Sequence, residues 1–163
     1  MKIIYKKGNL LQAKEDVIIH GCNAQGVMGA GVAKAIATDC PGAYKEYYWW
    51  CKNNEPTSIL GSIMWYFCNN ANMLIGKRLG NAITQKNYGR NKKFVSYSAI
   101  RKVMQHLNAE YTHYNYYNCE NFDPKPIAMP KIGAGLAGGD WAIISDIIEK
   151  ELTCIQPIVY YLK

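Results

Sequence analysis

The chain has 163 residues, of which 49% are hydrophobic and 19% are charged. This length and composition suit a single globular domain, and they exclude a disordered tail, a fibrous repeat and a membrane-spanning helix. Lysine and arginine outnumber the acidic residues by 19 to 12, which gives a net charge of +7 at pH 7. A basic excess of this size favours an anionic partner, either a phosphate-bearing small molecule or a nucleic acid.

The cysteines and the N-terminus indicate a cellular compartment. The chain has six cysteines, with no C-x-x-C pair and no cysteine close to a pair of histidines. This spacing does not match a zinc site, so we expect no metal and no cofactor. Residues 1–8 lack the apolar core of a secretory signal peptide. We therefore expect reduced, mostly buried thiols in a monomer of the cytoplasm, or of the host cytoplasm if a phage encodes it.

The first third of the chain alternates strand and helix patterns. Residues 3–5 predict a short strand, and residues 17–22 form an apolar run that is typical of a strand buried on both faces. Residues 29–37 are rich in small side chains and predict a helix. Residues 43–52 predict an amphipathic helix, because tyrosine and cysteine recur there at helical spacing, and Pro56 follows its end.

The middle of the chain continues this alternation. Residues 61–67 and residues 74–84 predict two strands, and apolar side chains at helical spacing predict a long helix from about Tyr97. Alternating strands and helices favour the α/β class, with a mixed sheet that helices cover on both faces.

The C-terminal third holds the last three predicted elements. Residues 127–132 predict a strand, and Pro130 within it indicates an edge strand or a bulge. Residues 141–152 predict a helix that Asp140 caps at its N-terminus. Residues 157–162 predict the last strand.

Two glycine-rich segments each lie between a predicted buried strand and a predicted helix. Residues 20–33 read HGCNAQGVMGAGVA, and residues 130–141 read PKIGAGLAGGDW. Glycine lets backbone N–H groups approach a ligand closely, and the N-terminus of the following helix favours phosphate. Ligands of α/β sheets bind beyond the carboxyl ends of the strands, so two such loops meeting there would suit a diphosphate with a sugar at one end. One loop alone is explained equally well by a tight turn, but two in the same context favour a ligand site.

Two better-known nucleotide motifs do not fit. Gly133, Gly135 and Gly138 match the G-x-G-x-x-G pattern, but no carboxylate follows about 20 residues later, as dinucleotide binding requires. Neither loop is followed by the Lys-Ser/Thr pair of a Walker A motif. The sequence therefore argues against both folds.

The two segments together resemble those of macro domains, and in particular those of the ADP-ribose 1″-phosphate phosphatases of yeast, bacteria and phages. The resemblance extends over residues 2–162. It implies a single macro domain over residues 1–163, with a three-layer α/β/α sandwich around a mixed central sheet. It also implies a cleft for ADP-ribose or ADP-ribose 1″-phosphate over the strand ends.

The resemblance carries site residues over to this chain. It places the distal ribose against Gly21, Cys22 and Asn23, with the Asn23 amide bonded to ribose hydroxyls. It places the diphosphate between two loops, whose residues are Met28, Gly29, Ala30, Gly31, Val32 and Ala33 on one side and Gly133, Ala134, Gly135, Leu136, Ala137, Gly138 and Gly139 on the other.

The resemblance places the adenine near Gly8, Asn9 and Leu10. Many family members have an aspartate at the position of Asn9, where the carboxylate accepts a bond from the adenine amino group. An asparagine oxygen accepts the same bond more weakly. Either Tyr160 or Tyr161 is expected to flank the base.

Hydrolysis of the 1″-phosphate requires an oriented water, stabilised phosphoryl oxygens and a protonated leaving group. Backbone N–H groups of the two loops are expected to stabilise the oxygens. His20 is the candidate general acid or base, because it ends a strand beside the ribose and histidine titrates near neutrality. A purely structural role, in which His20 is hydrogen-bonded to the backbone, is the alternative. We predict His20 and Asn23 as the catalytic residues.

Other functions remain open. A second macro-domain branch removes ADP-ribose from proteins or nucleic acids with a lysine and a phosphate-loop aspartate. Here Ala137 stands at the place of the aspartate, and Lys86 lies about one residue from the place of the lysine, which puts that mechanism in doubt. A non-catalytic reader of ADP-ribose is the further alternative.

The aromatic residues raise the possibility of a nucleic acid partner. Residues 44–50 and residues 111–122 interleave aromatic side chains with lysine and asparagine, as in platforms that stack single-stranded bases. Their helical spacing favours a core role instead, so nucleic acid is possible but not favoured. His106 and His113 have no motif around them, and we expect them at the surface or in packing.

Overall fold

The computed structural model describes residues 1–89, 92–118 and 124–162, with backbone alone for residues 113–118. This part of the chain contains a six-stranded sheet in the order β1-β6-β5-β2-β4-β3. The strands are β1 (Ile4–Lys7), β2 (Val17–Asn23), β3 (Ile63–Phe67), β4 (Arg78–Gln85), β5 (Lys125–Met129) and β6 (Ile155–Tyr161). Neighbouring strands run parallel, except that β3 is antiparallel to β4. The sheet is therefore mixed, which confirms the prediction.

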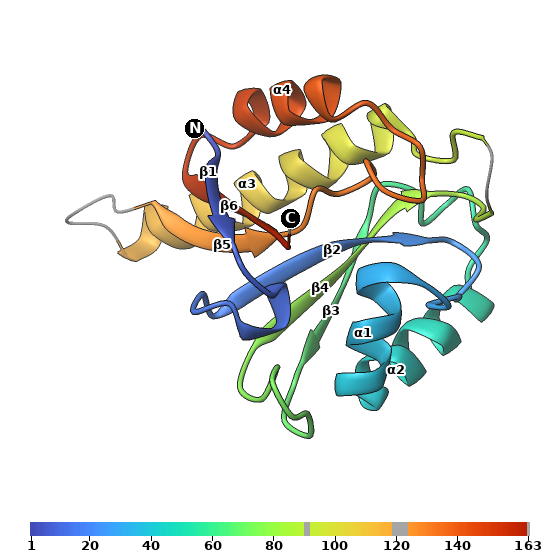
Figure 1. Cartoon of the computed structure of the whole chain (residues 1–163). Helices are drawn as coiled ribbons and strands as arrows, with labels where there is room; N and C mark the ends of the chain where they lie inside the picture. The colour runs from blue at the N-terminus through green and yellow to red at the C-terminus, as the bar shows by residue number, and fades with distance from the viewer. Residues whose placement is uncertain (90–91, 119–123, 163) are drawn as a thin grey trace.

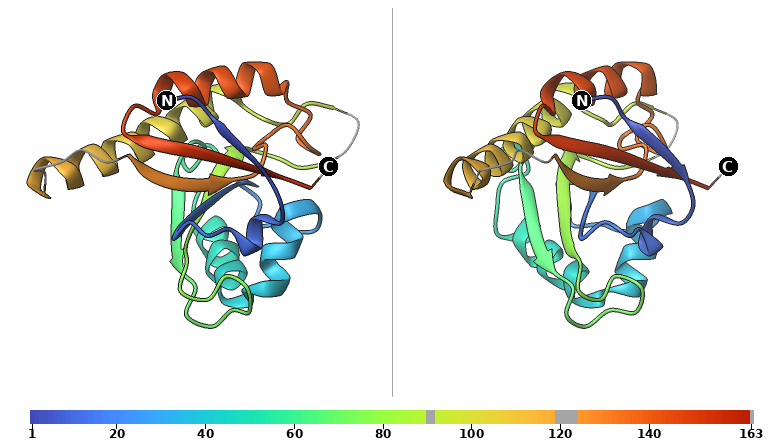
Figure 2. Two further views of the ribbon diagram at one scale, coloured as in Figure 1. Left: turned by 60° about the vertical axis from the view of Figure 1, so that its left-hand side comes forward. Right: turned by 90° about the vertical axis from the view of Figure 1, so that its left-hand side faces the viewer.

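Helices cover both faces of the sheet (Figures 1 and 2). They are α1 (Gly31–Asp39), α2 (Pro41–Lys52), α3 (Tyr97–Asn118) and α4 (Trp141–Glu151), and a short 3-10 turn, η1 (Leu10–Gln12), precedes β2. The pair α1 and α2 lies on one face, and the pair α3 and α4 lies on the other. The predicted three-layer α/β/α sandwich is confirmed.

The central strand β2 separates two cores. Ile18 and Ile19 are both fully buried, yet they belong to different hydrophobic clusters. Ile18 packs with Ile36 of α1, whereas Ile19 packs with residues of α3 and α4, including Ile144. Successive side chains of a strand point to opposite faces, so a continuous apolar run is what a strand between two helical layers requires.

Two of the predicted boundaries shift for local reasons. The helix predicted from residue 29 begins at Gly31, because Ala30 is still extended, with φ −153° and ψ 164°. The strand predicted from residue 74 begins at Arg78, because the carboxylate of Asp39 accepts the N–H of Leu74 and holds that segment in a turn.

The expectation of an edge strand or a bulge at Pro130 is wrong. β5 ends at Met129 and lies inside the sheet, between β6 and β2. Pro130 follows the strand, where its carbonyl accepts the N–H of Ile132 in a turn and its missing N–H costs no ladder bond. The N-cap predicted for the last helix is confirmed, since the side chain of Asp140 accepts the N–H of Ala142.

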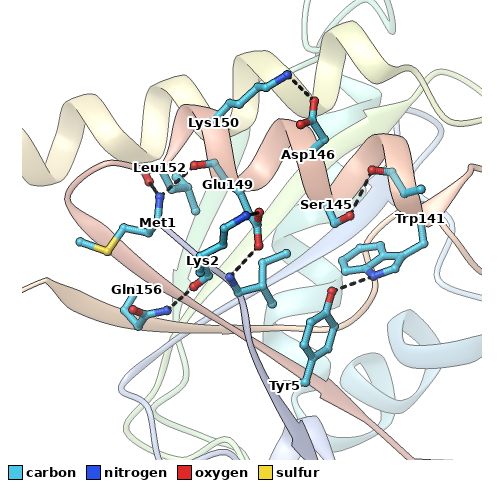
Figure 3. Close-up of polar contacts among 12 residues, drawn as sticks. Met1, Lys2, Tyr5, Trp141, Ser145, Asp146, Glu149, Lys150, Leu152 and Gln156 are labelled. Carbon is cyan, nitrogen blue, oxygen red and sulfur yellow. Dashed lines mark hydrogen bonds and ion pairs between the residues drawn. The ribbon is translucent and has the colours of Figure 1, made fainter.

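Side-chain hydrogen bonds and an ion pair connect the N-terminal residues and the edge strand β1 to α4 (Figure 3). Oε1 of Glu149 accepts the N–H of Ile3 at 3.0 Å, and Oε2 pairs with the ammonium of Lys2 at 2.7 Å. Farther along, Nε1 of Trp141 donates to the hydroxyl of Tyr5 at 3.1 Å. These contacts fix the chain that leads to η1 and the start of the site.

The described cysteines are buried, as predicted. Five cysteines are free thiols in buried positions: Cys22, Cys40, Cys51, Cys68 and Cys154. Cys119 lies outside the described residues. Within those residues, no helix has both the length and the apolar character that crossing a bilayer demands.

Candidate functional site

A cavity of about 480 Å³ opens beyond the carboxyl ends of β2, β4 and β5. The β2–α1 loop forms one wall and the β5–α4 loop forms the other, because parallel strands end at the same edge of the sheet. The predicted site residues that line it are His20, Gly21, Cys22, Asn23, Gly29, Ala30, Val32, Ala33, Gly133, Gly135, Leu136 and Ala137. The structure thus brings the two glycine-rich segments together.

A second cavity of about 430 Å³ continues the first. Four residues line both cavities: Val32, Pro130, Lys131 and Gly135. The predicted residues that line the second are Gly8, Asn9, Leu10, Gly31, Val32, Ala134 and Gly135, and both Tyr160 and Tyr161 also line it. The two cavities therefore adjoin along the four shared residues, and together they are called the cleft.

Three predicted binding residues line neither cavity. Met28 is buried in a cluster with Tyr47. Gly138 and Gly139 support the β5–α4 loop from behind, and a methyl group at Gly139 would lie 2.7 Å from the carbonyl oxygen of Gly133. Their direct contact with a ligand stays a prediction.

Asn23 holds the β2–α1 loop in shape. Its Oδ1 accepts the N–H groups of Gln25 at 3.0 Å and Val27 at 3.2 Å, and its Nδ2 donates to the carbonyl of Val27 at 2.7 Å. The hydroxyl of Tyr47 lies 3.1 Å from the same Oδ1, and burial raises the pKa of this phenol, which stays protonated. Most of the Asn23 amide is therefore engaged within the loop, and its predicted bond to a ribose stays a prediction.

The β5–α4 loop presents backbone donors to the cleft. The N–H groups of Gly135, Leu136 and Ala137 have no acceptor within the part of the chain that the structure describes. Gly133 has φ +74°, and a methyl group there would lie 2.7 Å from Cγ2 of Val95, so the loop requires glycine at this point. Adjacent unpaired N–H groups of this kind form a concave site for an anion.

His20 is buried beneath the first cavity, with 1% of its surface exposed. Its Nε2 lies 2.7 Å from Oδ1 of Asn81, and Sγ of Cys22 lies 3.7 Å from its Nδ1. Burial lowers the pKa of His20 to about 4, against the opposing effect of the bond to Asn81. The expectation that His20 titrates near neutrality is therefore wrong, because the protein buries this ring. His20 is neutral at pH 7, and its catalytic role stays a prediction.

Thr84 is a cleft residue that the sequence analysis missed. It ends the segment predicted as a strand, it lines the first cavity, and its Oγ1 is buried with no hydrogen-bond partner among the described residues. The Cβ that Gly21 lacks would lie 2.9 Å from this oxygen. The neighbouring parallel strand end was the available signal, since β4 pairs with β2 and must reach the same edge.

The charge in the described lining of the first cavity is positive. Lys131 is the charged residue among its described lining, and no carboxylate lines that part. Gln85 lines the cavity, whereas Lys86 does not and is exposed. Ala137 also lines the cavity and supplies no carboxylate. The arrangement attracts an anion without a carboxylate to repel it.

The predictions for the aromatic residues and the histidines have different outcomes. Tyr47 is fully buried, as a core role requires, whereas Trp49 on the same helix is 55% exposed. His106 is exposed, as expected. The side chains of residues 113–122, that of His113 included, lie outside what the structure describes.

Known proteins are similar in sequence to this chain over most of its length. The macro domain model matches residues 19–148. An ADP-ribose 1″-phosphate phosphatase of Meyerozyma guilliermondii is 26% identical over 97% of this chain and 98% of its own length. An uncharacterised 17.5 kDa protein from the tk–vs intergenic region of Enterobacteria phage T4 is 31% identical over 98% of this chain and 96% of its own length.

A solved structure has the same fold. The macrodomain of Mycobacterium tuberculosis DarG superimposes with a TM-score of 0.76, at 23% identity, over 97% of this chain and 96% of its own. The model match spans both glycine-rich loops, most of β2 and all of β5. This chain belongs to the macro domain family.

Proposed function

We propose that this protein binds ADP-ribose and hydrolyses the phosphate ester of ADP-ribose 1″-phosphate. The observation that carries the proposal is the pair of loops around the cleft. The β5–α4 loop has unpartnered N–H groups, Lys131 lies in the lining, and no carboxylate lines the described part. Such a cleft suits a ligand with several phosphate groups. The name of the Meyerozyma relative, ADP-ribose 1″-phosphate phosphatase, supports the same substrate.

The proposed reaction needs no group beyond water and the chain itself. The N–H groups of residues 135–137 stabilise the phosphoryl oxygens as the bond from phosphorus to the C1″ oxygen breaks. A water forms the new bond to phosphorus, and neutral His20 accepts its proton and returns it to the C1″ oxygen. The products are orthophosphate and ADP-ribose. Asn23 keeps the β2–α1 loop around the ribose.

The lysine–aspartate mechanism of the second branch has less support here. Ala137 supplies no carboxylate, and Lys86 lies outside the lining of both cavities. Release of ADP-ribose from a macromolecule and non-catalytic binding are therefore the alternatives that an experiment must separate.

One set of assays separates these functions. The protein is incubated with ADP-ribose 1″-phosphate, with ADP-ribosylated protein and with ADP-ribosylated DNA, and released phosphate and ADP-ribose are measured beside calorimetric binding of ADP-ribose. We expect phosphate release from the first substrate, its loss in His20→Ala and its retention in His106→Ala, an exposed position on α3. Binding without turnover would identify a reader, and release of ADP-ribose from a macromolecule would identify the other hydrolase.

We also propose that the whole chain forms one macro domain and acts as a monomer in the cytoplasm, with nucleic acid as a less favoured partner. Size-exclusion chromatography with light scattering tests the monomer. A dimer mass at micromolar concentration would contradict it.

A further inference from the structure

The orientation of the Asn9 amide is fixed by a backbone bond. Oδ1 of Asn9 accepts the N–H of Leu11 at 3.1 Å, as the cap of η1. A backbone N–H bonds only to an acceptor, so the amide oxygen of Asn9 faces Leu11. The Nδ2 group is then the part of the amide that is available to a ligand. Asn9 lines the second cavity, and its Nδ2 has no acceptor among the described residues.

A second unpaired donor lies beside Asn9. The N–H of Leu10 has no acceptor in the described ranges, and Lys131, whose ammonium lies 5.9 Å from the ring centroid of Trp141, lines both cavities. The neighbouring carbonyls are engaged: that of Asn9 accepts from Gln12, and that of Tyr161 accepts from Gly8. Beside Asn9, a ligand therefore meets the free donors of Asn9 and Leu10, and the carbonyls of Asn9 and Tyr161 are already bonded.

An aromatic wall is held rigidly beside these donors. The hydroxyl of Tyr160 donates to Oε2 of Glu15 at 2.9 Å, and the ammonium of Lys6 pairs with Oε1 at 2.7 Å. Burial opposes the ionisation of Glu15, but the bonds from Lys6 and Tyr160 prevail and lower its pKa. The phenol ring lies against Gly8, where a Cβ would stand 3.7 Å from Cδ1. This fixed ring suits a flat base stacked along the cavity.

We propose that this end of the cleft selects the base by its ring acceptors, so that the protein binds a 6-oxopurine nucleotide at least as well as an adenine nucleotide. The inference rests on the proposed function, because it assumes a nucleoside diphosphate in the cleft. Guanine and hypoxanthine present two adjacent acceptors, O6 and N7, whereas adenine presents an acceptor at N7 and an amino donor beside it. The donors of Asn9 and Leu10 match the first pattern, and Nδ2 of Asn9 meets another donor in the second.

The substitution Asn9→Asp tests the proposal with the cap intact. Aspartate caps as well as asparagine, so one oxygen still accepts the N–H of Leu11 while the other replaces the Nδ2 donor with an acceptor. Calorimetric dissociation constants are measured for ADP-ribose and for inosine diphosphate ribose, in the wild type, in Asn9→Asp and in Asn70→Asp. Asn70 is exposed outside the cleft lining, and the last variant carries the same charge change there.

The ratio of the two constants is the readout, since a general effect of charge on a diphosphate cancels in it. We expect wild type and Asn70→Asp to bind the inosine ligand at least as tightly as ADP-ribose. We expect Asn9→Asp to shift the ratio about tenfold toward ADP-ribose, in line with one reversed base contact. A wild-type preference for ADP-ribose, or a clearly smaller shift in Asn9→Asp, overturns this inference but leaves the proposed function. Failure of both ligands to bind overturns both.

Discussion

The phenol of Tyr47 and the side chain of Asn23 form a buried contact between α2 and the β2–α1 loop, with 3.1 Å between the hydroxyl oxygen and Oδ1. The same hydroxyl donates to the backbone carbonyl of Asn23. A helix that does not line the cleft thereby fixes the residue that organises one of its walls. Substitutions at Tyr47, Asn23, His20, Gly133 and Gly135 test the consequences of this architecture.

Removing the Tyr47 hydroxyl should weaken both the fold and the site. In Tyr47→Phe the buried carbonyl of Asn23 loses its donor, and we expect the free energy of unfolding to fall by about 1–3 kcal/mol. Urea denaturation measures this loss, and calorimetry should show weaker binding of ADP-ribose by the folded variant. Tyr44→Phe, half-buried on the same helix, is the control. Equal stability of the two variants would contradict the role of the contact.

Asn23→Ala should abolish phosphate release, because the β2–α1 loop loses the oxygen that accepts from Gln25 and Val27 and the donor that bonds Val27. Phosphate release is followed at saturating substrate, with circular dichroism to check the fold. Wild-type rates in this variant would contradict the placement of the ribose beside Asn23.

The protein should lose stability as the pH falls from about 6.5 to about 4. The pKa of His20 is lowered from 6.5 to about 4 in the fold, so within this window the unfolded chain binds a proton that the folded chain does not. Stability is full above pH 6.5 and falls by on the order of 3 kcal/mol as the pH drops to 4. Urea unfolding at several pH values should show a shallower decline in His20→Gln, which keeps an N–H donor for Asn81. Identical declines would remove His20 as the cause.

Two glycines of one loop should differ in their tolerance of alanine. Gly133 has φ +74° and a Cβ position 2.7 Å from Val95, whereas Gly135 has no heavy atom within 4 Å of its Cβ position. We expect Gly133→Ala to lose about 2 kcal/mol or more, and Gly135→Ala to stay within about 0.5 kcal/mol of wild type. Thermal unfolding of both variants measures the difference, and comparable losses would show that the loop does not depend on the backbone of Gly133.

The three layers of the fold and the pairing of the two loops could be predicted from the sequence. Hydrophobic periodicity indicates the layers, and the positions of the glycines indicate the loops. The run through Ile18 and Ile19 indicated a strand covered on both faces, and both side chains are fully buried. The prediction from Pro130 was wrong, because a proline that follows an interior strand has the same local sequence pattern as a proline in an edge strand.

The electrostatics of the site were beyond reach of the sequence. The neutrality of His20 comes from complete burial beside Asn81, and that residue is 61 positions away in the chain. The orphaned hydroxyl of Thr84 likewise depends on the register of β4 against β2. Such properties arise from distant residues that pack together, and no local spacing encodes them.

The carbonyl of Ala137, at the rim of the cleft, accepts the N–H groups of Phe94 at 2.8 Å and Val95 at 3.2 Å. A ligand seated on the donors of the β5–α4 loop would restrain this carbonyl together with them. Amide hydrogen exchange at Phe94 and Val95 would then slow on ligand binding, although neither residue lines the described cavities. The exchange rates of these two amides, which precede α3 and bond the β5–α4 loop, would therefore measure ligand binding in the cleft.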